Sequence, residues 1–226
     1  MIPIGILGGL GPAASSRLYS MLISLCPARH DQDHPDVLLF SKPSVPDRTA
    51  YLLGRGPSPL PALVDGLRTL EQSGARLLAL PCVTAHHFYN ELQAAVHVPL
   101  LNMLTLTAKS LAGRGFTRAA LLATEGTYAS GAFRKALEAY GIAAIVPSQA
   151  HVRELMALVY AIKAGEIPAH EQLDAIARPL LQQNAQRIIL GCTELSLFAG
   201  TRNHYIDPLR ILAQEILCNA RMYSNI

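Results

Sequence analysis

Short apolar runs that are typical of β-strands alternate with helix-forming stretches along the whole chain. The predicted strands are 4–7, 37–40, 77–80, 98–101, 119–123, 143–146 and 187–190. The predicted helices are 13–25, 59–73, 85–95, 105–112, 131–140, 152–164, 171–184 and 208–220. Strands that alternate with helices form parallel sheets joined by right-handed crossovers. The sequence therefore predicts an α/β fold.

The composition supports this fold and excludes several functions. Half of the residues are hydrophobic and 15% are charged, which suits parallel strands buried on both faces. The length of 226 residues allows one large domain or two small ones. The net charge of +3 is scattered, so a nucleic-acid surface is not expected. No apolar run approaches the length of a membrane span, and the N-terminus lacks the basic region of a signal peptide.

Three segments recur in the same order in the two halves of the chain. The aligned pairs are IGILGGLG (4–11) with AALLATEG (119–126), LLALPCVT (77–84) with RIILGCTE (187–194), and PLLNMLTLTAKSL (99–111) with HYIDPLRILAQEI (204–216). This internal repeat predicts two similar α/β halves, with chain crossovers near residues 103 and 205.

Two cysteines occupy mirrored positions in this repeat. Cys82 and Cys192 each follow an apolar strand by one residue. Ligands of parallel sheets bind beyond the carboxyl ends of the strands, so two facing halves would point both thiols into one cleft. Cys26 and Cys218 lie inside helices and are interpreted as core residues. Without a secretory signal, all four are expected to be reduced thiols of a cytoplasmic protein.

Two opposed thiols can invert a carbon stereocentre without a cofactor. A thiolate removes a proton from one face of the carbon, and the opposing thiol returns a proton to the other face. The N-terminus of a following helix would help to form the thiolate, and its N–H groups with Thr84 and Thr193 would hold a substrate carboxylate. A zinc site is disfavoured, because Cys82 and His86 lack a second Cys/His pair. His86 and His87 are expected to start the helix after the thiol, as supporting or surface groups.

The chain resembles the cofactor-independent aspartate/glutamate racemase family over nearly its whole length. The motifs IGILGGLGP, VPDRTAYLLG, PCVTAHHF, LLATEGTYASGAF and IILGCTEL stand in the family's order, and VPDRT and GCTEL point to the aspartate racemase branch. The resemblance implies two Rossmann-like halves around a cleft, Cys82 and Cys192 as the acid/base pair, and homodimers. It implies no pyridoxal phosphate, metal or nucleotide. The expected domains are 1–103 with 205–226, and 104–204.

The predicted substrate-binding residues surround the two thiols. They are Gly8, Gly9, Arg48, Thr84, Thr124, Thr127, Lys163, Thr193 and Glu194. Gly8 and Gly9 would let the backbone approach the ligand, although GGLG matches neither common phosphate-loop pattern. By resemblance, Arg48 and Lys163 would meet substrate carboxylates, and Glu194 would orient the second thiol.

One position departs from the family pattern. The first motif normally reads cysteine-asparagine-threonine, and here Val83 replaces the asparagine that would bind near the substrate ammonium group. Three functions remain open on the sequence alone. They are an amino-acid racemase acting on aspartate, a superfamily relative of the hydantoin racemase, maleate isomerase or arylmalonate decarboxylase type, and a non-catalytic amino-acid-binding protein.

Overall fold

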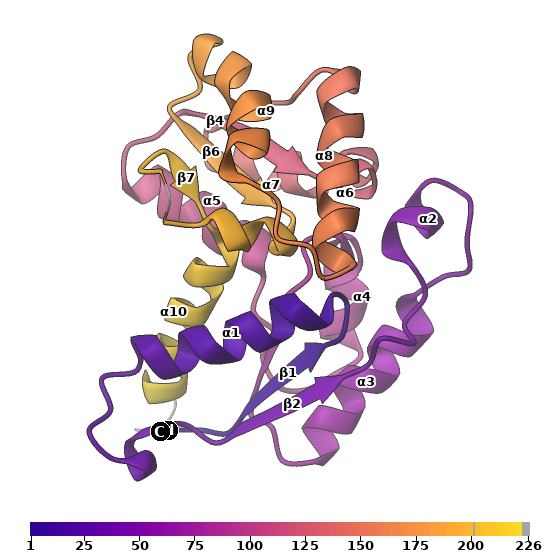
Figure 1. The fold of residues 1–226 in the computed structure, drawn as a ribbon. Coiled ribbons are helices and arrows are strands. Elements are labelled where there is room, and N and C mark those ends of the chain that lie inside the picture. The colour runs from indigo at the N-terminus through magenta and orange to yellow at the C-terminus, as the bar shows by residue number, and fades with distance from the viewer. Residues whose placement is uncertain (201, 223–226) are drawn as a thin grey trace.

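A computed structural model describes residues 1–200 and 202–222, which form two α/β halves (Figure 1). The first sheet has the order β2-β1-β3, with β1 at Ile4–Gly8, β2 at Val37–Ser41 and β3 at Leu77–Ala79. The second has the order β5-β4-β6-β7, with β4 at Arg118–Ala123, β5 at Ala143–Ile145, β6 at Arg187–Gly191 and β7 at Tyr205–Ile206. Every pairing is parallel. The predicted α/β fold with two parallel sheets is confirmed.

Helices cover both faces of each sheet. In the first half the helical segments are α1 (Pro12–Leu25), the short 3-10 helix η1 (Asp31–Asp33), α2 (Arg48–Leu52), α3 (Leu60–Gln72), the 3-10 helix η2 (Thr84–Phe88) and α4 (Tyr89–Ala94). After the first crossover they are α5 (Met103–Gly113), α6 (Glu125–Ser130), α7 (Ala132–Glu138), α8 (Gln149–Lys163), α9 (His170–Gln182), the 3-10 helix η3 (Thr193–Phe198) and α10 (Pro208–Met222).

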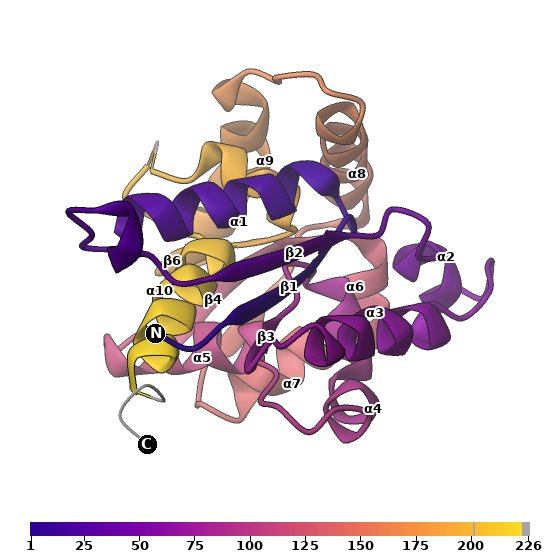
Figure 2. The same cartoon turned by 90° about the horizontal axis from the view of Figure 1, so that it is seen from below.

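One hydrophobic core is shared by the two halves. Side chains of both sheets, such as Ile4 and Leu121, pack together around α1, α5 and α10. Figures 1 and 2 show α10 running from the second half to the first, beside α1. Two further cores lie under α3 in the first half and under α8 and α9 in the second. Each fully buried leucine contributes about 1.5–3 kcal/mol to folding.

The chain crosses between the halves close to the expected positions. Helix α5 begins at Met103, and β7 pairs with β6, so residues 205–206 join the second sheet before α10 begins. The division into domains at these crossovers stays a prediction, because the shared core joins the halves along one side.

The predicted strand at 98–101 is wrong. Only one isolated bridge, between Leu78 and Leu100, continues the first sheet there. Pro99 has no N–H to donate. The side chain of Gln93 takes the place of a strand partner, since its amide nitrogen donates to the Val98 carbonyl (3.2 Å) and its oxygen accepts the Leu100 N–H (2.8 Å).

The single helix predicted at 85–95 is also wrong in detail. The segment forms the tight 3-10 helix η2 and then α4. In η2 the His86 N–H donates to the Val83 carbonyl three residues earlier, while the His86 ring contacts the Cys82 carbonyl oxygen. Helices α2 and α6 and strand β7 were not predicted either, because they are too short to show a periodic pattern.

The strand order determines where a ligand can bind. In the first sheet β2 lies on one side of β1 and β3 lies on the other side. In the second sheet β5 and β6 lie on opposite sides of β4. In such sheets the crevice opens at the carboxyl ends of the two strands where the connections diverge. Strand β3 leads to Cys82 and β6 leads to Cys192, so this rule places both cysteines at the crevices.

Candidate active site

Cys82 and Cys192 line the same narrow cavity between the two halves. The cavity is also lined by Leu10, Asp47, Arg48, Thr49, Val83, Thr84, Thr124, Lys163, Thr193 and Glu194. Its volume is about 20 Å³, which is room for about one water molecule. Each cysteine is 6% exposed and packs at the edge of its own half's core. Both cysteines therefore border one small cavity between the halves.

Cys192 is held as a thiol. Its Sγ donates a hydrogen bond to Glu194 Oε2 at 2.9 Å. Burial and the negative charge of Glu194 raise the pKa of Cys192 well above its usual value, and Lys163 opposes this only in part. The sequence did not predict which of the two cysteines is the thiolate, and the raised pKa of Cys192 disfavours a thiolate at this position. The segment that follows it is the 3-10 helix η3, and a carboxylate stands at the second position after the thiol.

The other oxygen of Glu194 faces the backbone of the first half. Glu194 Oε1 is buried and has no hydrogen-bond partner in the described residues. A Cβ atom added at Gly11 would lie 2.1 Å from this oxygen. Only glycine allows so close an approach, so Gly11 makes room for the carboxylate that contacts the second thiol.

Lys163 brings a positive charge to the cavity. It lies in the last turn of α8. Burial disfavours its charged form, but the negative charges of Glu194, Cys192 and Cys82 outweigh burial and raise the pKa of Lys163. No carboxylate oxygen of the described residues lies within 4.0 Å of its ammonium group, which stays available to an anionic ligand.

Three threonine hydroxyls bridge the two halves beside the cavity. Thr84 Oγ1, from the first half, lies 3.1 Å from Thr124 Oγ1 and 3.0 Å from Thr127 Oγ1, and the latter two are 3.1 Å apart. Each hydroxyl can donate to one neighbour and accept from the other. Thr84 and Thr124 line the cavity, whereas Thr127 supports them from behind.

Thr193 makes a second link between the halves. Its hydroxyl donates to the Pro81 carbonyl oxygen at 3.2 Å, next to Cys82. Thr193 also lines the cavity. The two predicted threonines that follow the cysteines, Thr84 and Thr193, are thus both at the site, and each also contacts the opposite half.

Arg48 lines the cavity, but most of its donors are already engaged. Its Nη2 donates to the Leu10 carbonyl at 2.7 Å, and Nη1 contacts the carbonyls of Val45 (3.3 Å) and Pro46 (3.1 Å). Its Nε is buried without a partner. The guanidinium group therefore ties the segment before α2 to the loop after β1, while it adds positive charge to the cavity.

Gly8 and Gly9 do not line the cavity. The Gly9 N–H donates to Ser15 Oγ at 3.0 Å, and Gly9 has φ +85°, which favours glycine. An added Cβ would lie 2.4 Å from the Lys42 nitrogen at Gly9 and 2.5 Å from Ser15 Oγ at Gly8. These glycines allow the tight turn after β1, and their direct contact with substrate stays a prediction.

Leu10, Asp47 and Thr49 also line the cavity and were not predicted from the sequence. Asp47 caps α2, since its Oδ1 accepts the Ala50 N–H at 2.8 Å. The pattern of an aspartate before Arg48 and Thr49 is a recognisable N-cap signal. It would have predicted the short helix that places Arg48 and Thr49 at the site.

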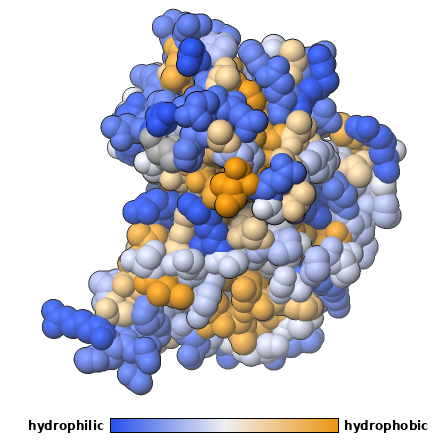
Figure 3. All heavy atoms as spheres, viewed as in Figure 1, coloured by the Kyte–Doolittle hydropathy of each residue, from blue (hydrophilic) through white to orange (hydrophobic). Residues whose placement is uncertain are grey.

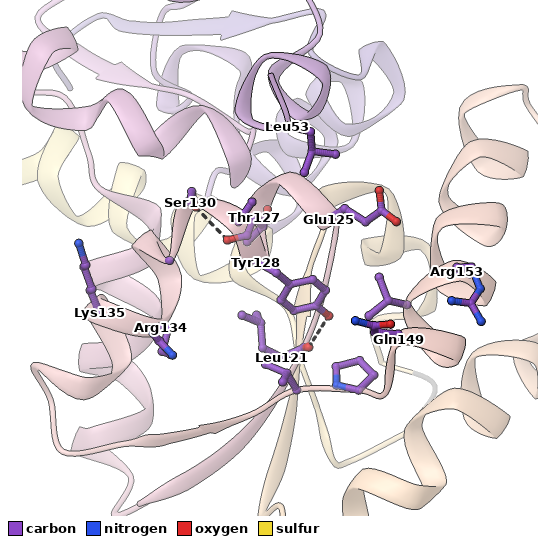
Figure 4. A pocket seen from close by; sticks show the side chains of 15 residues that line it. Leu53, Leu121, Glu125, Thr127, Tyr128, Ser130, Arg134, Lys135, Gln149 and Arg153 are labelled. Carbon is purple, nitrogen blue, oxygen red and sulfur yellow. Dashed lines mark hydrogen bonds between the residues drawn. The ribbon is translucent and has the colours of Figure 1, made fainter. Parts of the chain in front are cut away.

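A larger cavity of about 790 Å³ lies on the flank of the second half (Figure 4). It is formed by α6, α7 and the start of α8, and it contains no cysteine. Figure 4 shows Tyr128 in its centre, where the hydroxyl donates to the Leu121 carbonyl at 2.8 Å. Leu121 of β4 and the segment after β5 line this cavity, but the cysteines that follow β3 and β6 do not. The paired thiols identify the smaller cavity as the candidate active site.

A shallow groove of about 250 Å³ reaches the active site from outside. The groove shares Thr193 and Glu194 with the cavity of the candidate active site. It is bounded by α1 and by the loop between α8 and α9. Figure 3 shows an apolar patch over this loop and polar side chains along the waist between the halves. Ile167, in the loop, is 84% exposed. The groove marks one side from which the closed cavity can be approached.

The described part of the chain has neither a cluster of metal ligands nor a membrane-spanning helix. Within residues 1–200 and 202–222, no three His, Cys, Asp or Glu side chains gather as metal ligands would. Over the same part of the chain, no helix combines the length and the apolar character needed to cross a bilayer.

The comparisons with known proteins agree with this geometry. The sequence profile of the Asp/Glu/hydantoin racemase family matches residues 7–216. The broad specificity amino-acid racemase RacX of Bacillus subtilis (strain 168) is 32% identical over 206 residues, which cover 85% of this chain and 86% of the relative.

Two solved structures are similar over nearly the whole chain. The aspartate racemase of Picrophilus torridus is 29% identical with a TM-score of 0.87, over 97% of this chain and 94% of that one. PH1733 of Pyrococcus horikoshii OT3, an aspartate racemase homologue, is 24% identical with a TM-score of 0.79, over 98% and 100% of the two chains.

Proposed function

Because this chain belongs to the Asp/Glu/hydantoin racemase family, as an amino-acid racemase that works without pyridoxal phosphate, we propose that it racemises aspartate through Cys82 and Cys192. The observation that carries this proposal is the cavity that both cysteines line from opposite halves. A pair of acid/base groups on two sides of one carbon is what inversion of a stereocentre requires.

In the proposed reaction, Cys82 is the base at rest and Cys192 is the acid. Cys192 keeps its proton because burial and Glu194 raise its pKa. The Cys82 thiolate takes the proton of the substrate Cα, and the Sγ–H of Cys192 delivers its proton to the opposite face. Each turnover thus moves one proton onto Cys82 and one from Cys192. The reverse reaction uses the same two groups in exchanged roles.

Positive charge stabilises the intermediate in this scheme. Removal of the Cα proton leaves a carbanion whose charge spreads into the α-carboxylate. A preorganised cation in a site that excludes water stabilises such a developing charge strongly. Lys163 lines the cavity, the negative charges around it raise its pKa, and no carboxylate oxygen of the described residues lies within 4.0 Å of its ammonium group, so we assign it to the substrate carboxylate. Arg48 adds charge, and its unpaired Nε is the donor left for a ligand.

Aspartate suits a site with two cations and little space. Lys163 and Arg48 can balance two carboxylates, and the closed cavity favours a small substrate. We also expect the protein to be a cytoplasmic homodimer. Light scattering of the purified protein gives its mass in solution and so tests the dimer. In the same proposal, Lys163 and Arg48 bind the substrate together with Thr84, Thr124 and Thr193.

A broad-specificity racemase is the second candidate, and Val83 favours it. Val83 is 3% exposed and presents an apolar wall to the cavity. The relative of Bacillus subtilis is named for broad specificity. An apolar wall in place of an amide removes a polar contact worth about 0.5–1.5 kcal/mol near the ammonium group that every amino acid carries, and it leaves a surface against which neutral side chains can pack.

Deuterium exchange tests the proposal. L-aspartate, L-glutamate and a panel of neutral L-amino acids are incubated with the protein in D2O, and deuterium at Cα is followed together with the D-enantiomer. We expect exchange and racemisation of aspartate, and loss of racemisation in Cys82→Ser and Cys192→Ser. Exchange of neutral amino acids alone would select the broad-specificity candidate, and Val83→Asn should then shift preference toward aspartate. No exchange with any amino acid would refute the proposal.

A further inference from the structure

The residue four positions after each cysteine contacts the start of the neighbouring crossover helix. This residue is His86 after Cys82 and Ser196 after Cys192, and both are buried, at 3% and 0% exposure. His86 lies beside Met103, the first residue of α5, and Ser196 lies beside Asp207, which directly precedes α10. The two halves thus use chemically different side chains for the same connection.

His86 joins the Cys82 loop to the first crossover. The Met103 N–H donates to His86 Nε2 at 3.2 Å, so this nitrogen accepts. Its Nδ1 must then carry the proton and donate to the Cys82 carbonyl oxygen at 2.8 Å. Burial lowers the pKa of His86 and keeps the ring neutral, as this arrangement requires. The ring also stacks with Tyr89, whose hydroxyl donates to the Leu100 carbonyl at 2.9 Å.

Ser196 joins the Cys192 loop to the second crossover. Its Oγ donates to Asp207 Oδ2 at 2.6 Å, while Asp207 Oδ1 accepts the Leu209 N–H at 3.0 Å near the start of α10. Arg17 of α1, in the first half, donates from Nε to Ser196 Oγ at 3.0 Å. The Ser196 hydroxyl therefore donates one hydrogen bond and accepts another, and the two bonds fix η3 against the crossover and α1.

We propose that His86 and Ser196 are positioning residues, each holding the catalytic thiol of its own half in register with the crossover to the other half. The inference rests on the proposed roles of Cys82 and Cys192. Neither side chain lines the cavity, so each acts through its cysteine loop and not on the substrate.

In this proposal the two halves move relative to each other at the crossovers, so the hydrogen bonds of His86 and Ser196 to the crossovers affect where each thiol lies. A cavity of about 20 Å³ has to open to admit an amino acid and close again around it. Reacting atoms must then return to within about 3–3.5 Å of each other, and a misplacement of about 1 Å can reduce the rate by about 100-fold. A loop bonded to the crossover moves with it, which restores the position of the thiol at each closure.

Site-resolved alkylation tests the proposal without relying on turnover. Iodoacetamide labelling of the whole protein is quenched at intervals, and the modification of Cys82 and of Cys192 is measured separately by peptide mass. His86→Asn keeps a donor for the Cys82 carbonyl and loses the acceptor for Met103. His86→Gln keeps an acceptor and loses that donor. Ser196→Ala removes the second connection, and His87→Gln, at the exposed neighbouring histidine, is the matched control.

Each variant should affect the thiol of its own half. We expect the His86 variants to change the labelling rate of Cys82 by about 3-fold or more and Ser196→Ala to change that of Cys192, with kcat on aspartate lowered by about 10–100-fold and KM nearly unchanged. Equal changes at both cysteines, in parallel with a lower unfolding midpoint, would mean a general structural role and overturn the proposal. Unchanged labelling in folded variants would overturn it too. If wild type racemises no amino acid but the selective labelling holds, the proposed function fails and the positioning role stands.

Discussion

Removal of the Thr127 hydroxyl should loosen the contact between the halves. Thr127→Val deletes two of the three contacts in the threonine cluster, those to Thr84 Oγ1 (3.0 Å) and Thr124 Oγ1 (3.1 Å). The Thr84–Thr124 contact remains, but one hydroxyl proton of that pair loses its acceptor. Thr127 is 2% exposed, so water does not easily replace the lost partner.

The expected cost follows from the number of contacts. Each hydrogen bond contributes about 0.5–1.5 kcal/mol net, so loss of two lowers the free energy of unfolding by about 1–3 kcal/mol. For a chain of this size, about 1 kcal/mol shifts the unfolding midpoint by roughly 2–4 °C. Calorimetry or circular dichroism should therefore show a midpoint lower by about 2–12 °C.

A control and a double-mutant cycle make the measurement specific. Thr117→Val is the control, because Thr117 is exposed and its hydroxyl makes only one long contact, 3.5 Å to Gln186. Thr84→Val combined with Thr127→Val should show a coupling energy of at least about 0.5 kcal/mol. If Thr127→Val melts within about 1 °C of wild type, or if the two changes are additive, the cluster does not join the halves.

Three further outcomes follow from the charges at the site. Lys163→Met should lower kcat/KM for aspartate by at least about 100-fold, since it removes the cation at the cavity that is assigned to the substrate carboxylate; retained activity would contradict that role. Glu194→Gln removes a negative charge that raises the pKa of Cys192, so this thiol will lose its proton at lower pH, and the alkaline limb of the kcat/KM profile should move to lower pH; no shift would show that another group sets this limb. Arg48→Lys keeps the charge but loses the fork that contacts three carbonyls, and the free energy of unfolding should fall by about 1–3 kcal/mol in a urea titration, whereas unchanged stability would show that those contacts add little.

The central strands β1, β4 and β6 were predicted well because they are buried on both faces. Residues 4–8 are buried without exception, and such runs are visible as apolar sequence. The segment at 98–101 looked the same, but tertiary contacts decided its structure. Side chains of Gln93, Tyr89 and Glu71 bond to the backbone of Val98 and Leu100, and only the groups of Pro99 and Leu101 bond to Leu78 of β3, so a longer strand pairing is not formed there.

The cavity was predictable only in part, because the repeat gives strand ends and not the loops that cover them. The positions of Cys82 and Cys192 follow from the order of the strands. The segment with Asp47 and Thr49 belongs to α2, which packs on α6 of the other half. Gly126 allows this approach, since an added Cβ would lie 2.7 Å from Thr49 Cα. No local pattern in the sequence reports such a contact between distant segments.

The internal repeat places two equal thiols at the site, and the residues around them make the thiols unequal. Two positions after the cysteine, the first half has Thr84 and the second has Glu194. The Thr84 hydroxyl bonds to two other hydroxyls across the cleft, whereas the Glu194 carboxylate accepts a hydrogen bond from the Cys192 thiol and raises the pKa of that thiol. A racemase of this kind needs one base and one acid from two identical groups. Pseudo-symmetry supplies the geometry for inversion, and the difference between Thr84 and Glu194 supplies the distinction that lets the proposed reaction start with the proton on Cys192.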